Sequence, residues 1–323
     1  MALLALLLIP AEPVAAQAQG RPIRRVLITN DNGIDDPKIA ALARAFAPVA
    51  ETWVVAAAED RSGASNYLQA RRTGQFRVRP VDLGRGIRAY ALDGTPADCV
   101  VFALTGPLRE TPPDLVVSGI NGGANLADDW FGSGTIGAAR TAAYFGVPGI
   151  AVSGLMSEEP AEMAAAAEWV VRFARGELAA GLAAPPYLTV SFPETPLAHV
   201  RGVEVTTRAR GLTRGAAAPA GSADGWETWR ISVEVADGAA AGTDVDAVRR
   251  GRIAVIPMRV DEMDAEAMDA LRRRVQALPA LTPPAAARPW PQPPGNEKDG
   301  PRHGKARAVM HRGCRLSPVT CPL

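Results

Sequence analysis

The sequence predicts an α/β fold in which a mostly parallel sheet is covered by helices on both faces. Wholly apolar runs of strand length recur along the first half of the chain, and segments with helical apolar spacing separate them. Buried parallel strands are apolar on both faces, and the helices that connect them cover the sheet. The chain has 323 residues, of which 47% are hydrophobic, so it can bury the core of one large domain.

The expected elements of this half alternate between strand and helix. Strands are expected at residues 26–29, 52–57, 114–120 and 149–153. Helices are expected at residues 39–46, 134–145 and 160–175. Pro37, which is favourable in a first helical turn, precedes the first helix, and the last helix is amphipathic.

After about residue 185 the pattern changes to strands without long helices between them. Strands are expected at residues 187–192, 202–208, 227–235 and 252–257, a small-residue loop at 215–224, and a last helix at 260–278. We expect this region to add antiparallel hairpins to the sheet or to form an arm for contact between subunits.

Both ends of the chain differ from the expected domain, which covers residues 23–278. Residues 1–20 resemble a secretory signal, because residues 3–9 are wholly apolar and Ala16-Gln17-Ala18 matches an A-x-A cleavage pattern, although no Lys or Arg precedes the apolar run. A signal implies a periplasmic or secreted protein; the alternative is a disordered or buried N-terminus on a cytoplasmic one. Residues 281–323 are Pro-rich and then basic, and we expect disorder there.

Composition excludes several classes of function. The formal net charge is +1, so no surplus of either sign indicates a nucleic acid polymer as partner, and the apolar run at residues 3–9 is too short to span a membrane. The three cysteines show no C-x-x-C spacing, and the three histidines are scattered. Neither a zinc site nor a Ser-His-Asp triad is therefore indicated.

Three loops follow the expected strands, at residues 30–33, 59–66 and 119–135. Ligands of such sheets bind outside the carboxyl ends of the strands, so these loops should converge at one edge. The first, Asn30-Asp31-Asn32-Gly33, offers one carboxylate and two amide oxygens, which are ligands suited to a hard cation such as Mg²⁺. The alternative is a plain turn, because Asn-Gly is a strong turn signal.

The other two loops favour an anion beside that cation. Residues 60–66 combine hydroxyls, an amide and an Arg next to Gly63, which suits an oxyanion or a metal, although a solvated turn has the same composition. Ser133 is a natural helix cap, and the free N–H groups of the first turn after it form a phosphate site unless the residue serves only as a cap. Neither a G-x-G-x-x-G pattern after the first strand nor a Walker pattern with Lys is present, so dinucleotide binding fits less well.

The loop motifs, taken in order, resemble those of the SurE family of survival nucleotidases. The resemblance covers about residues 24–275. The matching segments are Ile28-Thr29-Asn30-Asp31-Asn32-Gly33-Ile34, Arg61-Ser62-Gly63-Ala64-Ser65-Asn66, Gly94-Thr95-Pro96-Ala97-Asp98-Cys99-Val100, Val117-Ser118-Gly119-Ile120-Asn121-Gly122-Gly123-Ala124-Asn125-Leu126, Ser133-Gly134-Thr135, Gly242-Thr243-Asp244 and residues 253–261.

The resemblance implies a fold, a site and an activity. It implies a Rossmann-like SurE fold with a C-terminal β-hairpin extension, assembled as a homodimer or homotetramer. It implies that a divalent metal, Mg²⁺ or Mn²⁺, is held by four residues and that a further four surround the phosphate. The metal positions are Asp31, Asn32, Ser62 and Asn121, and the phosphate positions are Asn125, Ser133, Gly134 and Thr135. The implied substrate is a nucleoside 5′- or 3′-monophosphate or another small phosphomonoester.

Three departures from the family pattern bear on activity. The second of two consecutive aspartates is Asn32 here, which removes one negative ligand and should weaken metal binding. Thr141 replaces a Glu, and Lys38 replaces a Gly. We expect the Lys38 side chain to extend into water rather than toward a phosphate.

We therefore expect a metal-dependent phosphomonoesterase with Asp31 as general base or essential ligand. The alternative is a nucleotide- or phosphate-binding protein that does not hydrolyse its ligand, because Asn32 has weakened the metal site. A nucleotide-sugar transferase is disfavoured, since the matched loops surround only a phosphate and a metal.

Overall fold

A computed structural model describes residues 22–179, 187–211, 213–235, 238–260, 268 and 271–274. The expected signal at residues 1–20 and the expected tail at 281–323 lie outside this range. The chain divides into two compact units, Met1–Met263 and Asp264–Leu323. In the second unit Met268 and residues 271–274 are helical, within the expected last helix, whereas Val260 at its expected start lies in a bend.

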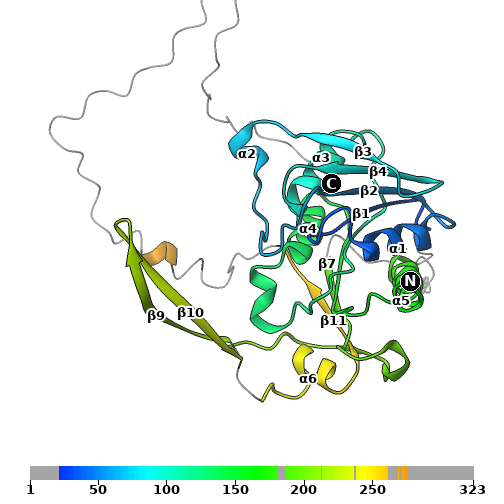
Figure 1. Cartoon of the computed structure of the whole chain (residues 1–323). Helices are drawn as coiled ribbons and strands as arrows, with labels where there is room; N and C mark the ends of the chain where they lie inside the picture. The colour runs from blue at the N-terminus through cyan, green and yellow to red at the C-terminus, as the bar shows by residue number, and fades with distance from the viewer. Residues whose placement is uncertain are drawn as a thin grey trace, which may run out of the picture. The chain divides into compact units, whose positions relative to one another are not determined.

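A nine-stranded sheet forms the centre of the first unit (Figure 1). Its strands lie in the order β3-β4-β2-β1-β5-β6-β7-β11-β8, and neighbours from β4 to β7 run parallel. The strands are β1 (Arg25–Thr29), β2 (Glu51–Ala57), β3 (Val78–Val81), β4 (Ile87–Leu92), β5 (Leu115–Ser118), β6 (Gly149–Ser153), β7 (Tyr187–Ser191), β8 (Val203–Val205) and β11 (Ile253–Met258). β3 runs antiparallel to β4 and β11 antiparallel to β7, so the predicted mostly parallel sheet is confirmed.

Helices cover both faces of the sheet. The longer ones are α1 (Pro37–Phe46), α3 (Pro96–Thr105), α4 (Gly134–Tyr144) and α5 (Pro160–Ala179); the short ones are α2 (Ala70–Thr73), α6 (Asp244–Arg249) and the 3-10 turns η2 (Ala127–Phe131) and η3 (Leu197–His199). Side chains of α1 and α5 pack with Val26 and Ile28 of β1, whereas those of α3 and α4 pack with Leu27. This division follows from the alternation of side chains along a strand. None of the helices in the described part of the chain is long and apolar enough to cross a membrane.

The helices begin at capping residues that the sequence supplies. Asp36 accepts a hydrogen bond from the Lys38 N–H at α1, and Ser133 accepts one from the Ile136 N–H at α4. Thr95 and Asp98 form a reciprocal capping box at α3. Such caps satisfy backbone donors that a first helical turn leaves unpaired.

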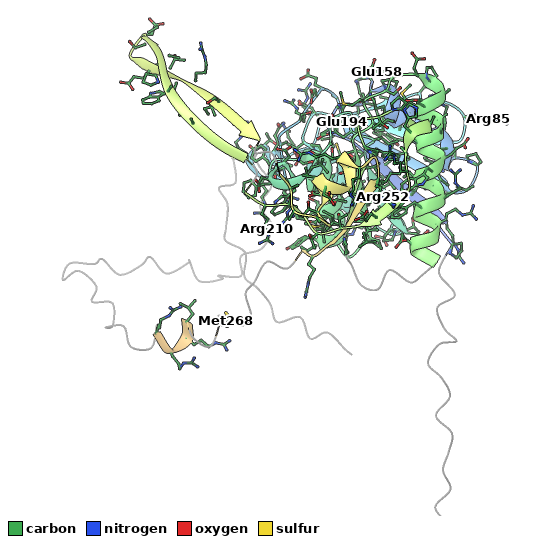
Figure 2. The ribbon with its side chains drawn as sticks, turned by 90° about the horizontal axis from the view of Figure 1, so that it is seen from below. Arg85, Glu158, Glu194, Arg210, Arg252 and Met268 are labelled. Carbon is green, nitrogen blue, oxygen red and sulfur yellow. The ribbon has the colours of Figure 1, made fainter. Side chains whose placement is uncertain are left out.

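The region after residue 185 differs in part from the prediction. β7 and β11 extend the main sheet, and residues 215–224 form most of a strand, β9 (Thr213–Ala223), where a loop was expected. β9 pairs with β10 (Trp226–Val235) as a separate two-stranded antiparallel hairpin, and the side chains of residues 215–232 are exposed (Figure 2). The loop prediction was wrong because a strand of small residues has no apolar alternation, and its pairing with β10 decides its conformation.

The position of β1 marks the place where a ligand can enter. β1 pairs with β2 on one side and with β5 on the other, so the chain leaves β1 in one direction and later returns to its opposite side. At such a reversal the loops after the neighbouring strands separate and leave a crevice. The loops after β1 and β5 contain Asp31 and Asn121.

Candidate metal and phosphate site

Asp31 lies directly after β1 and contacts the start of α4. Its side chain is buried, and its two carboxylate oxygens accept hydrogen bonds from the Thr135 N–H at 3.0 Å and the Thr135 Oγ1 at 2.8 Å. The first turn of α4 carries the positive end of the helix dipole, which favours a carboxylate at this place. Because the Thr135 N–H is engaged with Asp31 and the Ile136 N–H with Ser133, these two donors are already used inside the protein.

Two glycines let α4 approach the loops so closely. A Cβ at Gly134 would lie 3.0 Å from the Asp31 Cβ, and one at Gly137 would collide with the backbone carbonyl of Ser65. Larger residues at these positions would push the helix away from both loops. The small-residue composition of α4, which the sequence already shows, is thus what brings Asp31, Ser65 and the helix start together.

The loop after β2 is tied to both neighbours. The Arg61 N–H donates to the Asp31 carbonyl at 2.7 Å, and the Ser65 N–H donates to the Gly132 carbonyl at 3.0 Å. Ser62, expected as a metal ligand, is exposed, and its Oγ and N–H both donate to Asp60 Oδ1 at 2.7 Å. Asp60 was not among the predicted site residues. The sequence feature that could have identified it is an acidic residue two positions before Ser62.

The loop after β5 contains the remaining expected residues. Gly119 is joined to β1 by a hydrogen bond from its N–H to the Thr29 carbonyl, and Asn121 Nδ2 donates to the Gly123 carbonyl at 2.7 Å. The Asn125 N–H donates to Ser153 Oγ at 3.2 Å. The loop is therefore held between β1 and β6, at the same end of the sheet as Asp31.

Several buried polar atoms around this edge have no hydrogen-bond partner among the described residues. They include Asn30 Oδ1, Asn32 Oδ1 and Asn125 Nδ2, together with the hydroxyl of Ser118. An unsatisfied buried polar group costs about 1–3 kcal/mol, so proteins seldom leave several together without a ligand or water. Two amide oxygens suit a hard cation, and the free amide hydrogens of Asn125 suit an anion.

The electrostatics of the site favour a positive partner for Asp31. Burial raises the pKa of Asp31 above the usual aspartate value, and the nearby charge of Asp60 acts in the same direction. The two hydrogen bonds from Thr135 lower the pKa but do not cancel the effect of burial. A bound cation would stabilise the ionised carboxylate. The residues present fit a hard metal ion that is coordinated mainly by neutral oxygens, since no cluster of three His, Cys, Asp or Glu exists in the described ranges.

Lys38 is not where the sequence analysis expected it. Its side chain is only 6% exposed, and Nζ lies 3.9 Å from the carboxylate of Glu158. The expectation that it extends into water is therefore wrong, because the N-terminus of α1 packs beside the segment that leads into α5. Thr141, the other noted departure, accepts a hydrogen bond from Asn66 Nδ2 at 2.7 Å.

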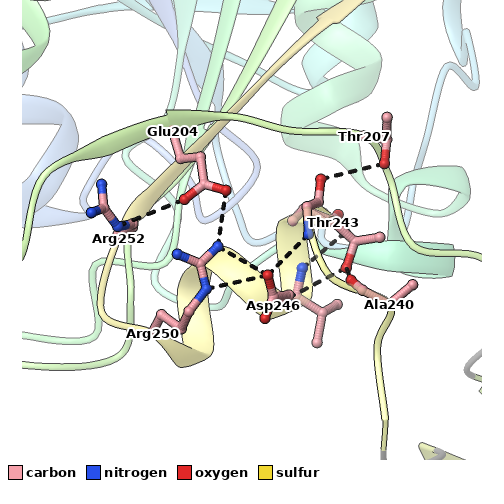
Figure 3. Close-up of polar contacts among 10 residues, drawn as sticks. Glu204, Thr207, Ala240, Thr243, Asp246, Arg250 and Arg252 are labelled. Carbon is pink, nitrogen blue, oxygen red and sulfur yellow. Dashed lines mark hydrogen bonds and ion pairs between the residues drawn. The ribbon is translucent and has the colours of Figure 1, made fainter.

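A second polar cluster lies at α6, and we call it the α6 clasp; it consists of Glu204, Thr207, Thr243, Asp244, Asp246 and Arg250. Arg250 bridges Asp246 and Glu204, both at 2.9 Å (Figure 3). The Asp244 N–H donates to the Thr207 carbonyl at 2.8 Å. The buried Asp244 carboxylate accepts the N–H groups of Ala127 at 2.8 Å, Ala209 at 2.8 Å and Val245 at 2.9 Å. The clasp thereby holds η2, the turn that leads to Ser133.

Comparisons with known proteins place these features in a family. The family model described as Survival protein SurE matches residues 26–214. The chain is 39% identical over 249 residues to the 5'-nucleotidase SurE of Ectopseudomonas mendocina (strain ymp), covering 76% of this chain and 96% of that protein. It is 41% identical over 253 residues to the 5'-nucleotidase SurE of Stutzerimonas stutzeri (strain A1501), with the same coverage. The crystal structure of the SurE protein from Aquifex aeolicus superposes with a TM-score of 0.67 at 30% identity, covering 78% of this chain and 99% of that one.

Proposed function

The chain belongs to the survival protein SurE family, and from this membership and its site we propose that it is a metal-dependent nucleotidase. The reaction is the hydrolysis of a nucleoside 5′- or 3′-monophosphate to nucleoside and phosphate. The observation that carries the proposal is the buried carboxylate of Asp31, which lies against the start of α4 beside amide oxygens without partners.

The residues that would hold the metal are Asp31, Asn32, Ser62 and Asn121. Their oxygens suit Mg²⁺ or Mn²⁺, and the unpaired Asn32 Oδ1 supports a place for such an ion. When bound, the ion would offset phosphate charge and acidify a water molecule. Asp60, which accepts hydrogen bonds from the N–H and Oγ of Ser62, adds a further carboxylate beside these residues.

The protein's own groups would orient the phosphate. Asn125 Nδ2 is a buried donor without a partner, and the N-terminal turn of α4 at Ser133 and Gly134 directs positive potential toward the same edge. Asp31 is the carboxylate among the proposed residues that could accept a proton from an attacking water or hold the metal, because it lies against the start of α4 at this edge. Phosphoryl transfer depends mainly on positioning and charge stabilisation, so a site without histidine is adequate.

The assembly is part of the proposal as well. The exposed β9–β10 hairpin is suited to contact between copies, which supports a homodimer or a homotetramer.

The test is a phosphatase assay on purified protein. Nitrophenyl phosphate and a panel of nucleoside 5′- and 3′-monophosphates are supplied with Mg²⁺, with Mn²⁺ and with chelator, and nucleotide binding is measured in parallel. We expect turnover that requires the metal and is lost in Asp31→Asn but kept in Asp82→Asn, a change at an exposed turn between β3 and β4. Binding without metal-dependent turnover would refute the proposal and favour the non-hydrolysing alternative.

A further inference from the structure

We propose that Phe131 is a stacking platform for the nucleobase of the substrate and sets a preference for purine nucleotides. The inference rests on the proposed nucleotidase function and deepens it. The residues that bind phosphate and metal recognise the part that all phosphomonoesters share. Selection of a nucleotide therefore requires a separate group that contacts the base. The position, exposure and support of the Phe131 ring fit that task.

Phe131 lies on the rim of the site. It is the last residue of η2, two positions before Ser133, so its Cα lies within roughly 7 Å of the Ser133 Cα. The Phe131 carbonyl accepts a hydrogen bond from Ser65 Oγ at 2.8 Å, and the next carbonyl accepts the Ser65 N–H at 3.0 Å. The backbone of Phe131 is therefore fixed to the loop that carries Ser62 and lies close in sequence to Ser133, a proposed phosphate residue.

The ring is open to solvent but well supported. Phe131 is 72% exposed, and its ring makes an edge-to-face contact with Trp130 at a centroid distance of 5.9 Å. Arg208 lies 4.0 Å and Arg140 5.3 Å from the Trp130 ring centroid. Trp130 is thus held by two guanidinium groups, and Phe131 rests against it. A ring held in place before binding loses little conformational freedom when a ligand stacks on it.

The rest of the rim is also apolar. Tyr67, 52% exposed, follows the loop of Ser65, and Met156, 60% exposed, follows Leu155, whose N–H donates to the Asn121 carbonyl. Single exposed apolar side chains are ordinary, but here Tyr67 lies beside the loop after β2, and Phe131 and Met156 lie beside the loop after β5. An aromatic base fits such a rim, whereas a bare sugar phosphate would leave it uncovered.

Stacking on an aromatic side chain predicts the direction of selectivity. Every base has a π-face, and alanine substitution of a stacking partner typically costs about 1–3 kcal/mol per base, or roughly a fivefold to 150-fold change in affinity. Purines offer the larger face and should gain most. Removal of Phe131 should therefore act on the nucleotide and not on the sugar phosphate alone.

The experiment compares adenosine monophosphate, uridine monophosphate and ribose 5-phosphate, using wild type, Phe131→Ala and Phe131→Tyr with saturating Mn²⁺. We expect Phe131→Ala to lower kcat/KM for adenosine monophosphate about tenfold, mainly through KM, with a smaller loss for uridine monophosphate and none for ribose 5-phosphate. Phe131→Tyr should restore the wild-type values. Val49→Ala is the control, because Val49 is 41% exposed just before β2, at the opposite end of that strand from the loop that carries Ser62.

Two results would overturn the platform: equal losses for all three substrates, or no loss for any of them. Calorimetric binding of the same compounds separates this proposal from the proposed function. If wild type hydrolysed nothing but bound adenosine monophosphate in a Phe131-dependent way, the nucleotidase proposal would fail and the platform would stand. If binding did not depend on Phe131, the platform would fail whatever the activity.

Discussion

The site formed by the loops after β1, β2 and β5 and the α6 clasp both contain buried polar groups. The two regions differ in how far those groups are hydrogen-bonded. At the site, Asn30, Asn32 and Asn125 each keep a buried side-chain atom without a hydrogen-bond partner in the described chain. In the clasp, the buried Asp244 carboxylate accepts three backbone N–H groups. Satisfied buried polar groups rigidify a structure, whereas unsatisfied ones cost stability and are kept where a ligand completes them.

The difference separates residues that serve binding from residues that serve folding. A change at the site should affect activity more than stability, because the polar atoms without partners there contribute little to the stability of the ligand-free protein. A change in the clasp should do the opposite. Three substitutions and one change of pH test this difference.

The largest effect is expected for Asp31→Asn. Loss of the only carboxylate among the four proposed metal ligands should lower phosphatase activity by more than about a hundredfold, since partners of metal ligands alone are worth about 10–100-fold. The Asn Oδ1 can accept the Thr135 N–H, and the Asn Nδ2 can donate to Thr135 Oγ1 in place of the present bond from that hydroxyl, so the variant should remain folded. Activity assays and thermal unfolding check both points, and an active or unfolded variant would contradict the division.

Asp244→Ala should act on stability instead. It would leave the N–H groups of Ala127, Ala209 and Val245 without their acceptor, which should lower the free energy of unfolding by about 3 kcal/mol. Urea unfolding measures this loss. Asp246→Ala, which removes a more accessible carboxylate of the same clasp, is the control and should cost clearly less. A similar loss of stability in both variants would show that the backbone contacts of Asp244 contribute no more to stability than the contacts of Asp246.

Asn32→Asp should increase the metal affinity of the site. A second carboxylate beside Asp31 should raise Mn²⁺ affinity about tenfold or more and lower the stability of the metal-free protein, because two like charges would then lie together. Calorimetric titration gives the affinity, and unfolding with chelator gives the stability. Unchanged affinity would place Asn32 outside the metal shell.

The smallest effect concerns pH. Because burial raises the pKa of Asp31 in the folded protein, the metal-free native state binds a proton more tightly than the unfolded state. Stability should therefore fall as pH rises from the ordinary aspartate pKa through the raised value, by at most about 1.4 kcal/mol per pH unit for one proton. Unfolding of wild type and Asp31→Asn in chelator, measured between mildly acidic and neutral pH, should show this slope in wild type alone. A slope that persists in Asp31→Asn would assign it to another group.

Local patterns determined much of the fold and the list of site residues. The apolar runs of β1, β2, β6 and β7 and the helical spacing of α1 and α5 specify their elements without tertiary help, because buried strands and amphipathic helices have distinct periods. The loop motifs identified the family, and the structure places Asp31 and Asn121 in the loops that follow the paired parallel strands β1 and β5. Whether those residues bind metal and phosphate stays a prediction.

Tertiary structure alone decided the rest. The small-residue segment of β9 forms a strand by pairing with β10, and Lys38 is buried with its Nζ 3.9 Å from Glu158, which precedes α5. The engagement of Thr135 with Asp31 and the three N–H groups around Asp244 join residues up to 117 positions apart. A sequence pattern shows periodicity and local turn chemistry. It does not show contacts between residues that are distant in the sequence and meet only in the folded protein. The fold class could therefore be read from the chain, while the division between a binding edge and a structural clasp required the folded molecule.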